Sequence, residues 1–250
     1  MPIGIICAMN EEIALLEQDI QLEQETVLAG RRFLCGTLYG KEVVLVMSRI
    51  GKVAVAVTTT LLAECFHASP ILFVGTAGAV SPQLQIGDIV IGDRSVQHDF
   101  DANEDSPFQV PLIGVSYFRS DESLTRLAHE AADSYFQEEF TQDVPPEHLK
   151  QFGITRPQVV TGTIASGDQF VRDPAKGRWL YEAVENIQCV EMEGAAMAQV
   201  CYEFQIPFTI LRVISDGANH NTPVVFDEFV RGAARYFTRG CLRALLRRIP

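Results

Sequence analysis

Cys189-Val190-Glu191-Met192-Glu193-Gly194-Ala195-Ala196 is a short apolar run that ends in two glutamates and then continues into a predicted helix. Further along, Val213-Ile214-Ser215-Asp216 ends a second apolar run in an aspartate. In an open α/β sheet, ligands bind outside the carboxyl ends of the strands. Carboxylates held there can bind sugar hydroxyls, or protonate a leaving group if their pKa is raised. The two segments therefore predict strands of an α/β sheet with a polar site at its edge.

Three further apolar runs end in the same manner. Polar or glycine-rich residues follow them at Asn10-Glu11-Glu12, Gly75-Thr76-Ala77-Gly78 and Ser166-Gly167-Asp168. If most strands run parallel, many of these ends line one edge of the sheet. We expect a pocket there, with several carboxylates beside glycine backbone.

The alternation of strands and helices predicts an α/β sandwich with a mixed or parallel central sheet. Composition does not break along the chain and no repeat is present, so we expect one domain over residues 1–250. Strands are expected at 3–8, 71–74, 88–91, 159–165, 188–190 and 208–214, with a hairpin at 32–47. Helices are expected from Asn10, at 51–65, 121–136 and 176–184, from Glu193, and as one long amphipathic helix over 226–245. Residues 102–114 are expected to form an irregular loop, and residues 137–156 a polar insertion or mobile loop.

Composition excludes several classes of function. The formal net charge of −12 repels phosphate backbones, so we expect no nucleic-acid partner. The six cysteines are scattered without a CxxC pair or a histidine at ligand spacing, which indicates a reducing compartment and no metal site. No window approaches the roughly 20 apolar residues of a membrane span, and the N-terminus lacks a leader pattern. We expect a cytoplasmic protein with no membrane partner.

Each candidate site residue also has a purely structural interpretation. Glu12 is either a general base or a first-turn glutamate favoured by the helix dipole. Glu193 either grips a diol, since a carboxylate accepts two hydroxyl bonds, or starts a helix in the same way. Gly75-Thr76-Ala77-Gly78 either brings backbone N–H groups to a ligand or forms a tight strand-to-helix turn. GxGxxG and GxxxxGK[ST] are both absent, so no dinucleotide or triphosphate cofactor is expected.

Taken together, the segments resemble the nucleoside phosphorylase/nucleosidase superfamily, and within it the 5′-methylthioadenosine/S-adenosylhomocysteine nucleosidases. The resemblance covers almost the whole chain. Its motifs are 4–12 (GIICAMNEE), 48–53 (SRIGKV), 75–78 (GTAG), 86–90 (IGDIV), 98–101 (HDFD), 166–170 (SGDQF), 190–193 (VEME), 214–216 (ISD) and 226–229 (FDEF). It implies a three-layer α/β/α sandwich with a central mixed β-sheet, nucleoside phosphorylase-like, and hydrolysis of the bond between adenine and ribose without a cofactor.

The resemblance also implies roles for individual residues in this chemistry. Asp216 matches the general acid that protonates adenine, and Glu12 matches the base that activates water. Glu193 matches the residue that holds the 2′- and 3′-hydroxyls of the ribose, with Met192 against the sugar. The remaining matched binding positions are Glu191, Thr76, Ala77, Gly78 and Ser215 around the ligand, Phe170 and Val171 at adenine, and Met9, Ile50 and Phe226 at the 5′-thio group.

Two departures from the family pattern affect the expected 5′ end of the pocket. Arg49 stands where a small residue is usual, so it is expected to narrow or charge the pocket. Residues 102–112 form a short acidic loop with Glu104 and Asp105, and the resemblance implies a homodimer in which this loop completes the neighbouring site.

Three other functions remain open at this point. A phosphorylase on the same scaffold needs a phosphate site, usually with an arginine before the glycine segment, where this chain has Phe73-Val74. A hydrolase for a bulkier, futalosine-type nucleoside would keep the same catalytic carboxylates. A silent adenosine-binding sensor would not need both an acid and a base.

Overall fold

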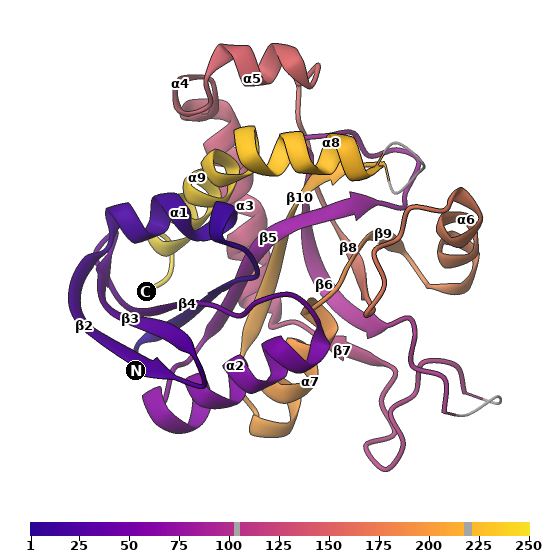
Figure 1. Cartoon of the computed structure of the whole chain (residues 1–250), viewed down its shortest axis with the longest axis horizontal. Helices are drawn as coiled ribbons and strands as arrows, with labels where there is room; N and C mark the ends of the chain where they lie inside the picture. Colours follow the sequence, from indigo (N-terminus) through magenta and orange to yellow (C-terminus); the bar gives the residue numbers. More distant parts are fainter. Residues whose placement is uncertain (103–105, 218–221) are drawn as a thin grey trace.

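A computed structural model describes residues 1–102, 106–217 and 222–250 of the chain. Its centre is one mixed ten-stranded sheet (Figure 1). The strands are β1 (Ile3–Cys7), β2 (Gln21–Leu28), β3 (Arg31–Leu38), β4 (Lys41–Met47), β5 (Ile71–Ala79), β6 (Ile89–Gln97), β7 (Tyr117–Arg119), β8 (Val159–Ser166), β9 (Ile187–Glu191) and β10 (Phe208–Asp216). The predicted mixed α/β architecture is confirmed.

Five strands of this sheet close into a ring. β5 pairs in parallel with β10, which pairs antiparallel with β6. β6 and β8 are parallel, β8 and β9 are parallel, and β9 returns to β5 in antiparallel orientation. β1 and β4 continue the sheet outward from β5 in parallel. The ring brings the carboxyl ends of β5 and β10 and the end of β9 to one rim of the sheet.

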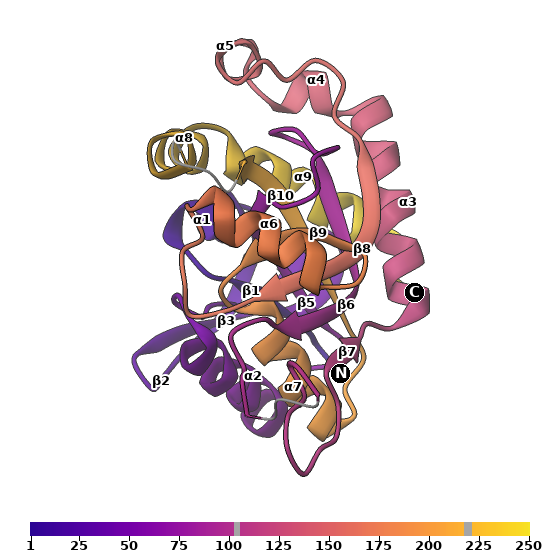
Figure 2. The ribbon, with the colours of Figure 1, turned by 90° about the vertical axis from the view of Figure 1, so that its right-hand side faces the viewer.

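Helices cover both faces of the sheet (Figures 1 and 2). One face carries α1, α3 and the C-terminal helices, and the other carries α2 and α7, each packed on its own apolar core. α6 lies beside β8 and β9. The helices are α1 (Asn10–Asp19), α2 (Lys52–Phe66), α3 (Glu122–Glu138), α4 (Phe140–Asp143), α5 (Pro146–Gln151), α6 (Pro174–Ala183), α7 (Gly194–Phe204), α8 (Thr222–Phe229), the π-helical η1 (Val230–Ala234) and α9 (Arg235–Leu246). None of them, within the described residues, is long and apolar enough to cross a membrane.

The N-terminal hairpin is a three-stranded meander. β3 and β4 form the predicted hairpin, and β2 adds an edge strand that sequence analysis missed. Six of the eight β2 residues are exposed, because the strand has neither a buried face nor a second partner. Its polar sequence therefore lacks the alternation by which strands are found.

Residues 137–156 are not the irregular insertion that their composition predicts. They form the end of α3 and the short helices α4 and α5. Asp143 pairs with Arg239 at 2.8 Å and with Arg243 at 3.0 Å, while Arg243 also reaches Glu139 at 2.6 Å. These ion pairs fasten the segment to α9.

The predicted single C-terminal helix has two α-helical parts joined by the π-helical turn η1. A π turn inserts one residue into the helical repeat, and such turns are frequent near functional sites. Its carboxyl-terminal part, α9, packs against α3 and α1, as the apolar spacing predicts. Its amino-terminal part, α8, carries Phe226 to the rim of the ring described above.

Candidate active site

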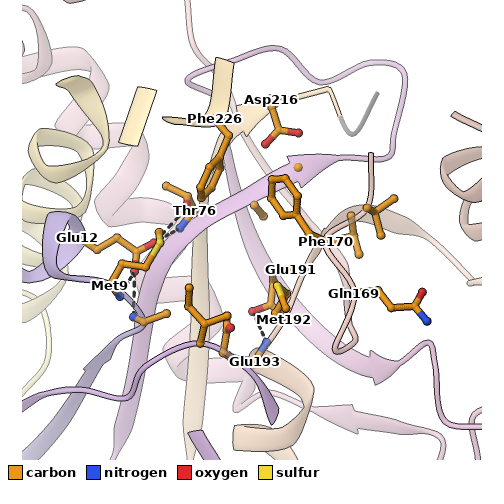
Figure 3. A pocket seen from close by; sticks show the side chains of 16 residues that line it. Met9, Glu12, Thr76, Gln169, Phe170, Glu191, Met192, Glu193, Asp216 and Phe226 are labelled. Atoms are coloured by element: carbon orange, nitrogen blue, oxygen red, sulfur yellow. Dashed lines mark hydrogen bonds between the residues drawn. The ribbon is translucent and has the colours of Figure 1, made fainter. Parts of the chain in front are cut away.

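A pocket opens at this rim and encloses about 640 Å³, including the space at its mouth (Figure 3). The sequence-predicted residues that line it are Met9, Glu12, Ile50, Thr76, Ala77, Gly78, Phe170, Val171, Glu191, Met192, Glu193, Asp216 and Phe226. Ala8, Gln169 and Val190 complete the lining. Residues from seven separate segments of the chain therefore meet at one place.

Glu12 lies in the first turn of α1 and is 1% exposed. Its Oε2 accepts hydrogen bonds from the backbone N–H groups of Ala8 (2.9 Å) and Met9 (3.2 Å). Its Oε1 accepts from the backbone N–H (2.9 Å) and the hydroxyl (3.0 Å) of Thr76. Burial raises the pKa of Glu12 above its ordinary value, although Arg212 and these hydrogen bonds oppose the rise. The side chain is thus held rigidly at the end of β5.

The segment Gly75-Thr76-Ala77-Gly78 is not a turn. It continues β5 to Ala79, and the Thr76 N–H is bonded to Glu12 rather than left for a ligand, as the other interpretation of this segment would require. The reason for glycine at position 75 is close packing. A Cβ atom there would lie 2.3 Å from Arg212 Nη1 and 2.8 Å from Glu12 Oε1.

Asp216 ends β10 and is 2% exposed. The Ser215 hydroxyl lies 2.7 Å from Asp216 Oδ2 and 3.2 Å from the carbonyl oxygen of Ala77. Ser215 itself is fully buried, so it lies behind Asp216 rather than at the pocket surface. Its place in the structure fits orientation of Asp216 better than direct contact with a ligand. Glu12 and Asp216 lie on different sides of the pocket (Figure 3).

The two glutamates at the end of β9, Glu191 and Glu193, have different surroundings. Glu191 accepts hydrogen bonds from the backbone N–H groups of Glu193 (3.1 Å) and Gly194 (2.9 Å), from the Ser166 hydroxyl, and from Arg212. Glu193 is 5% exposed and its Oε1 accepts from the Gly51 N–H at 2.8 Å. Burial and the charge of Glu191 raise the pKa of Glu193 to about 8. Glu191 is therefore committed to internal contacts, whereas Glu193 retains an oxygen for a ligand.

Arg212 is the main feature of the site that sequence analysis missed. It stands in the middle of β10, is 1% exposed, and forms an ion pair with Glu191. Its guanidinium carbon lies 4.0 Å from the centroid of the Phe73 ring. Burial alone would lower the pKa of Arg212, but the carboxylates of Glu191, Glu193 and Glu12 raise it. An arginine inside an otherwise apolar strand could have revealed this ion pair from the sequence, because buried charges are almost always paired.

Aromatic and apolar side chains form the open part of the pocket. The rings of Phe170 and Phe226 meet edge to face, with centroids 5.3 Å apart. Phe170 is 44% exposed and Ile50 is 56% exposed, and both line the pocket. They offer apolar area that a ligand can cover.

Arg49 does not narrow or charge this pocket, contrary to the sequence-based expectation. Its Nη2 donates a hydrogen bond to the carbonyl oxygen of Gly30 at 2.7 Å, in the β2–β3 turn. Glu104 and Asp105 lie outside the described residues. The rest of their loop is described, and there the Phe108 ring packs edge to face against Trp179.

Comparison with protein families gives a match to the phosphorylase superfamily over residues 2–247. This chain belongs to that superfamily. One curated relative is the 5′-methylthioadenosine/S-adenosylhomocysteine nucleosidase of Lysinibacillus sphaericus, which is 37% identical over 98% of this chain and 99% of its own length.

Solved structures of the superfamily share the fold. The 5′-methylthioadenosine/S-adenosylhomocysteine nucleosidase of Neisseria meningitidis, in complex with methylthio-immucillin-A, has a TM-score of 0.87 and 30% identity over 99% of each chain. The futalosine hydrolase of Helicobacter pylori has a TM-score of 0.82 and 32% identity, covering 100% of this chain and 98% of that one. The first is named for methylthioadenosine and S-adenosylhomocysteine, and the second for futalosine.

Proposed function

We propose that this protein hydrolyses the N-ribosidic bond of 5′-thio-substituted adenine nucleosides, 5′-methylthioadenosine and S-adenosylhomocysteine, to adenine and a thioribose. The observation that carries the proposal is the convergence of Glu12, Glu193 and Asp216, all buried, on one pocket with an apolar mouth. The named relatives, one of them bound to a methylthio inhibitor, agree with it. The carboxylates provide for the three tasks of the reaction: activating water, holding the sugar and protonating the leaving group.

Glu12 is the proposed base. Three of its four hydrogen-bond donors are backbone N–H groups, which fix the carboxylate, and the fourth is the rotatable hydroxyl of Thr76. A water molecule that takes the place of this hydroxyl at Oε1 would face the sugar. The raised pKa strengthens Glu12 as a base, because a carboxylate with a higher pKa accepts a proton more readily.

Asp216 is the proposed acid that protonates adenine as the bond to ribose breaks. It is buried at the end of β10, and it lines the pocket on a different side from Glu12. We expect the adenine ring to stack on Phe170, with its edge toward the backbone of Val171 and with Gly78 and Ala77 also in contact with the ligand. Met9, Ile50 and Phe226 form the proposed 5′-thio end.

Glu193 is proposed to hold the ribose diol, with Met192 against the sugar. An ionised Glu193 accepts two hydroxyl bonds, and the negative charge stabilises the positive charge that develops at the anomeric carbon. Its Oε1 accepts the Gly51 N–H, and its other oxygen, Oε2, is the one proposed to accept the sugar hydroxyls.

Hydrolysis is favoured over phosphorolysis by the charges around the pocket. Within the described residues, the lining contains Glu12, Glu191, Glu193 and Asp216 and no basic side chain. Arg212 is not part of the lining, and its positive charge is neutralised by the ion pair with Glu191. A phosphate dianion would meet net negative charge.

The test is to incubate the purified protein with methylthioadenosine, with and without phosphate, and to identify the sugar. We expect adenine and free 5-methylthioribose at the same rate in both. A sugar 1-phosphate formed only with phosphate would contradict hydrolysis. Futalosine belongs in the same panel because a futalosine hydrolase is among the similar structures.

We also propose that the protein is a cytoplasmic homodimer in which the loop 102–112 reaches the neighbouring pocket. Ile50 and Leu112 are exposed apolar side chains, and Leu112 belongs to this loop. Sedimentation should give a dimer at micromolar concentration. A monomer with full activity would contradict both parts of the idea.

A further inference from the structure

The start of α2 is held by carboxylates from two distant loops rather than by its own cap. Gly51, the N-cap residue, makes no side-chain cap and has φ of +101°. The Lys52 N–H instead donates to Asp168 Oδ1 at 2.9 Å, and the Gly51 N–H donates to Glu193 Oε1 at 2.8 Å. Two of the free N–H groups at this helix start are therefore satisfied by residues more than one hundred positions away.

A second set of bonds closes around the same point. The Lys52 ammonium pairs with Asp99 Oδ1 at 2.6 Å, and Asp99 Oδ2 accepts the backbone N–H of Asp168 at 2.8 Å. The Lys52 and Asp99 side chains are only 17% and 15% exposed. The bonds form a loop from Lys52 to Asp99, on to Asp168, and back to the Lys52 backbone. We call these three residues the clasp.

Packing leaves the clasp little room to rearrange. A Cβ at Gly51 would lie 3.2 Å from Asp168 Oδ1, and one at Gly167 would lie 2.4 Å from His98 Nε2 and 3.0 Å from the Asp99 carboxyl carbon. Burial lowers the pKa of His98 to about 4, so this neighbour is neutral near pH 7 and does not compete with Lys52 for Asp99. The ammonium and the Asp168 N–H hold Asp99 ionised, with its pKa below the ordinary value in spite of burial.

The clasp lies directly beside two proposed substrate contacts. Gly51 precedes Lys52 and donates to Glu193, and Asp168 lies two residues before Phe170. Movement of α2 away from Asp168 would withdraw the Gly51 N–H from Glu193. This N–H favours the ionised form of a glutamate whose burial opposes ionisation.

We propose that Lys52, Asp99 and Asp168 are positioning residues that lock the start of α2 against Glu193 and so fix this carboxylate for the ribose diol. The proposal rests on the proposed nucleoside hydrolysis. It assigns no substrate contact to the clasp. Its effect is exerted through Gly51, and it should therefore depend on the presence of the Glu193 carboxylate and of the sugar hydroxyl that Glu193 holds.

The experiment compares Lys52→Met with wild type on methylthioadenosine and on its 2′-deoxy analogue. We expect kcat/KM for methylthioadenosine to fall at least about tenfold, because a shift of about 1 Å in a group that positions the substrate lowers the rate strongly. The fall for the deoxy analogue should be much smaller. Asp99→Asn should behave in the same way. Lys52→Arg, which keeps a cation, should recover most of the loss.

Two controls separate positioning from general damage. Arg126→Met removes an exposed ion pair with Glu130 on α3 and should leave both substrates unaffected. In the background of Glu193→Ala, Lys52→Met should cost little more, because residues that act as a unit are non-additive. Thermal melts show whether each variant is folded. If Lys52→Met is unfolded, Asp99→Asn takes its place in the comparison.

The outcomes are distinct for the two levels of inference. If wild type cleaves neither nucleoside, the proposed function fails. If wild type is active and the clasp variants lose both substrates equally, or if the losses of Lys52→Met and Glu193→Ala add fully, the clasp does not act through Glu193 and the proposal is overturned.

Discussion

Replacing Gly75 by alanine should damage catalysis out of proportion to the single carbon atom that is added. The new Cβ would lie 2.3 Å from Arg212 Nη1 and 2.8 Å from Glu12 Oε1, whereas ordinary contact begins at 3.4 Å. One or both side chains must therefore retreat by about 1 Å. Arg212 is fixed by Glu191 and by the Phe73 ring, and Glu12 is fixed by its four hydrogen bonds, so the added methyl group must disturb this pair of side chains or the β5 backbone beside them.

A displacement of this size in the proposed base should lower kcat by roughly 10²-fold, while KM changes much less. The overpacking should cost about 1–3 kcal/mol of unfolding free energy, which leaves the protein folded. The assay is release of adenine from methylthioadenosine at saturating substrate, together with the urea midpoint of each protein.

Gly92→Ala is the matched control for this change. It adds the same atom in β6, where the Cβ would meet Ile164 Cδ1 at 2.9 Å and Ile210 Cβ at 3.6 Å, which are apolar atoms. It should lower stability similarly and leave kcat near the wild-type value. If Gly75→Ala retains kcat within a few-fold of wild type, the argument that Gly75 makes room for Glu12 and Arg212 is wrong.

Four further predictions follow from the site and from α9. Glu12→Gln and Asp216→Asn should each lower kcat by at least about 10²-fold, the scale of acid–base catalysis, and a kcat near wild type for either would remove its assigned role. Phe226→Ala should reduce the preference for methylthioadenosine over adenosine, which we expect to be about 10- to 200-fold in kcat/KM in the wild type. Because the pKa of Glu193 is raised to about 8 in the folded protein, its stabilising contribution is complete below its ordinary pKa and is lost as pH rises through about 8. Melting temperatures of wild type should therefore fall more steeply between pH 6 and 9 than those of Glu193→Gln, and parallel curves would contradict this. Arg243→Met should lower the unfolding free energy by about 1–3 kcal/mol with kcat unchanged, since it releases Glu139 and one bond of Asp143 far from the pocket, and an unchanged melting temperature would show that these ion pairs do not fasten α4 to α9.

The local sequence was sufficient to predict the elements that are buried on one face or on both faces. β1 is a continuous apolar run, β10 is mostly apolar, and α9 has regular apolar spacing, so these elements were predicted, whereas only the first half of β5 was, because its second half contains Gly75 and Thr76. The elements that were missed, or that were predicted wrongly, are those whose sequence carries no such pattern. β2 is exposed on an edge, α4 and α5 are too short to show a period, and the π turn leaves the composition of its helix unchanged.

The sequence by itself determined that Glu12, Glu193 and Asp216 stand at the ends of apolar strands or starts of helices, and hence near one edge of a sheet. Only the tertiary structure decided which carboxylate faces the pocket and which is neutralised beneath it. The pairing of Glu191 with Arg212, the contact of Gly75 with both Glu12 and Arg212, and the clasp around Lys52 all join residues far apart in the chain. The physical reason is that these distances are set by the register between strands and by the closure of the sheet into a ring, which no local pattern of residues encodes.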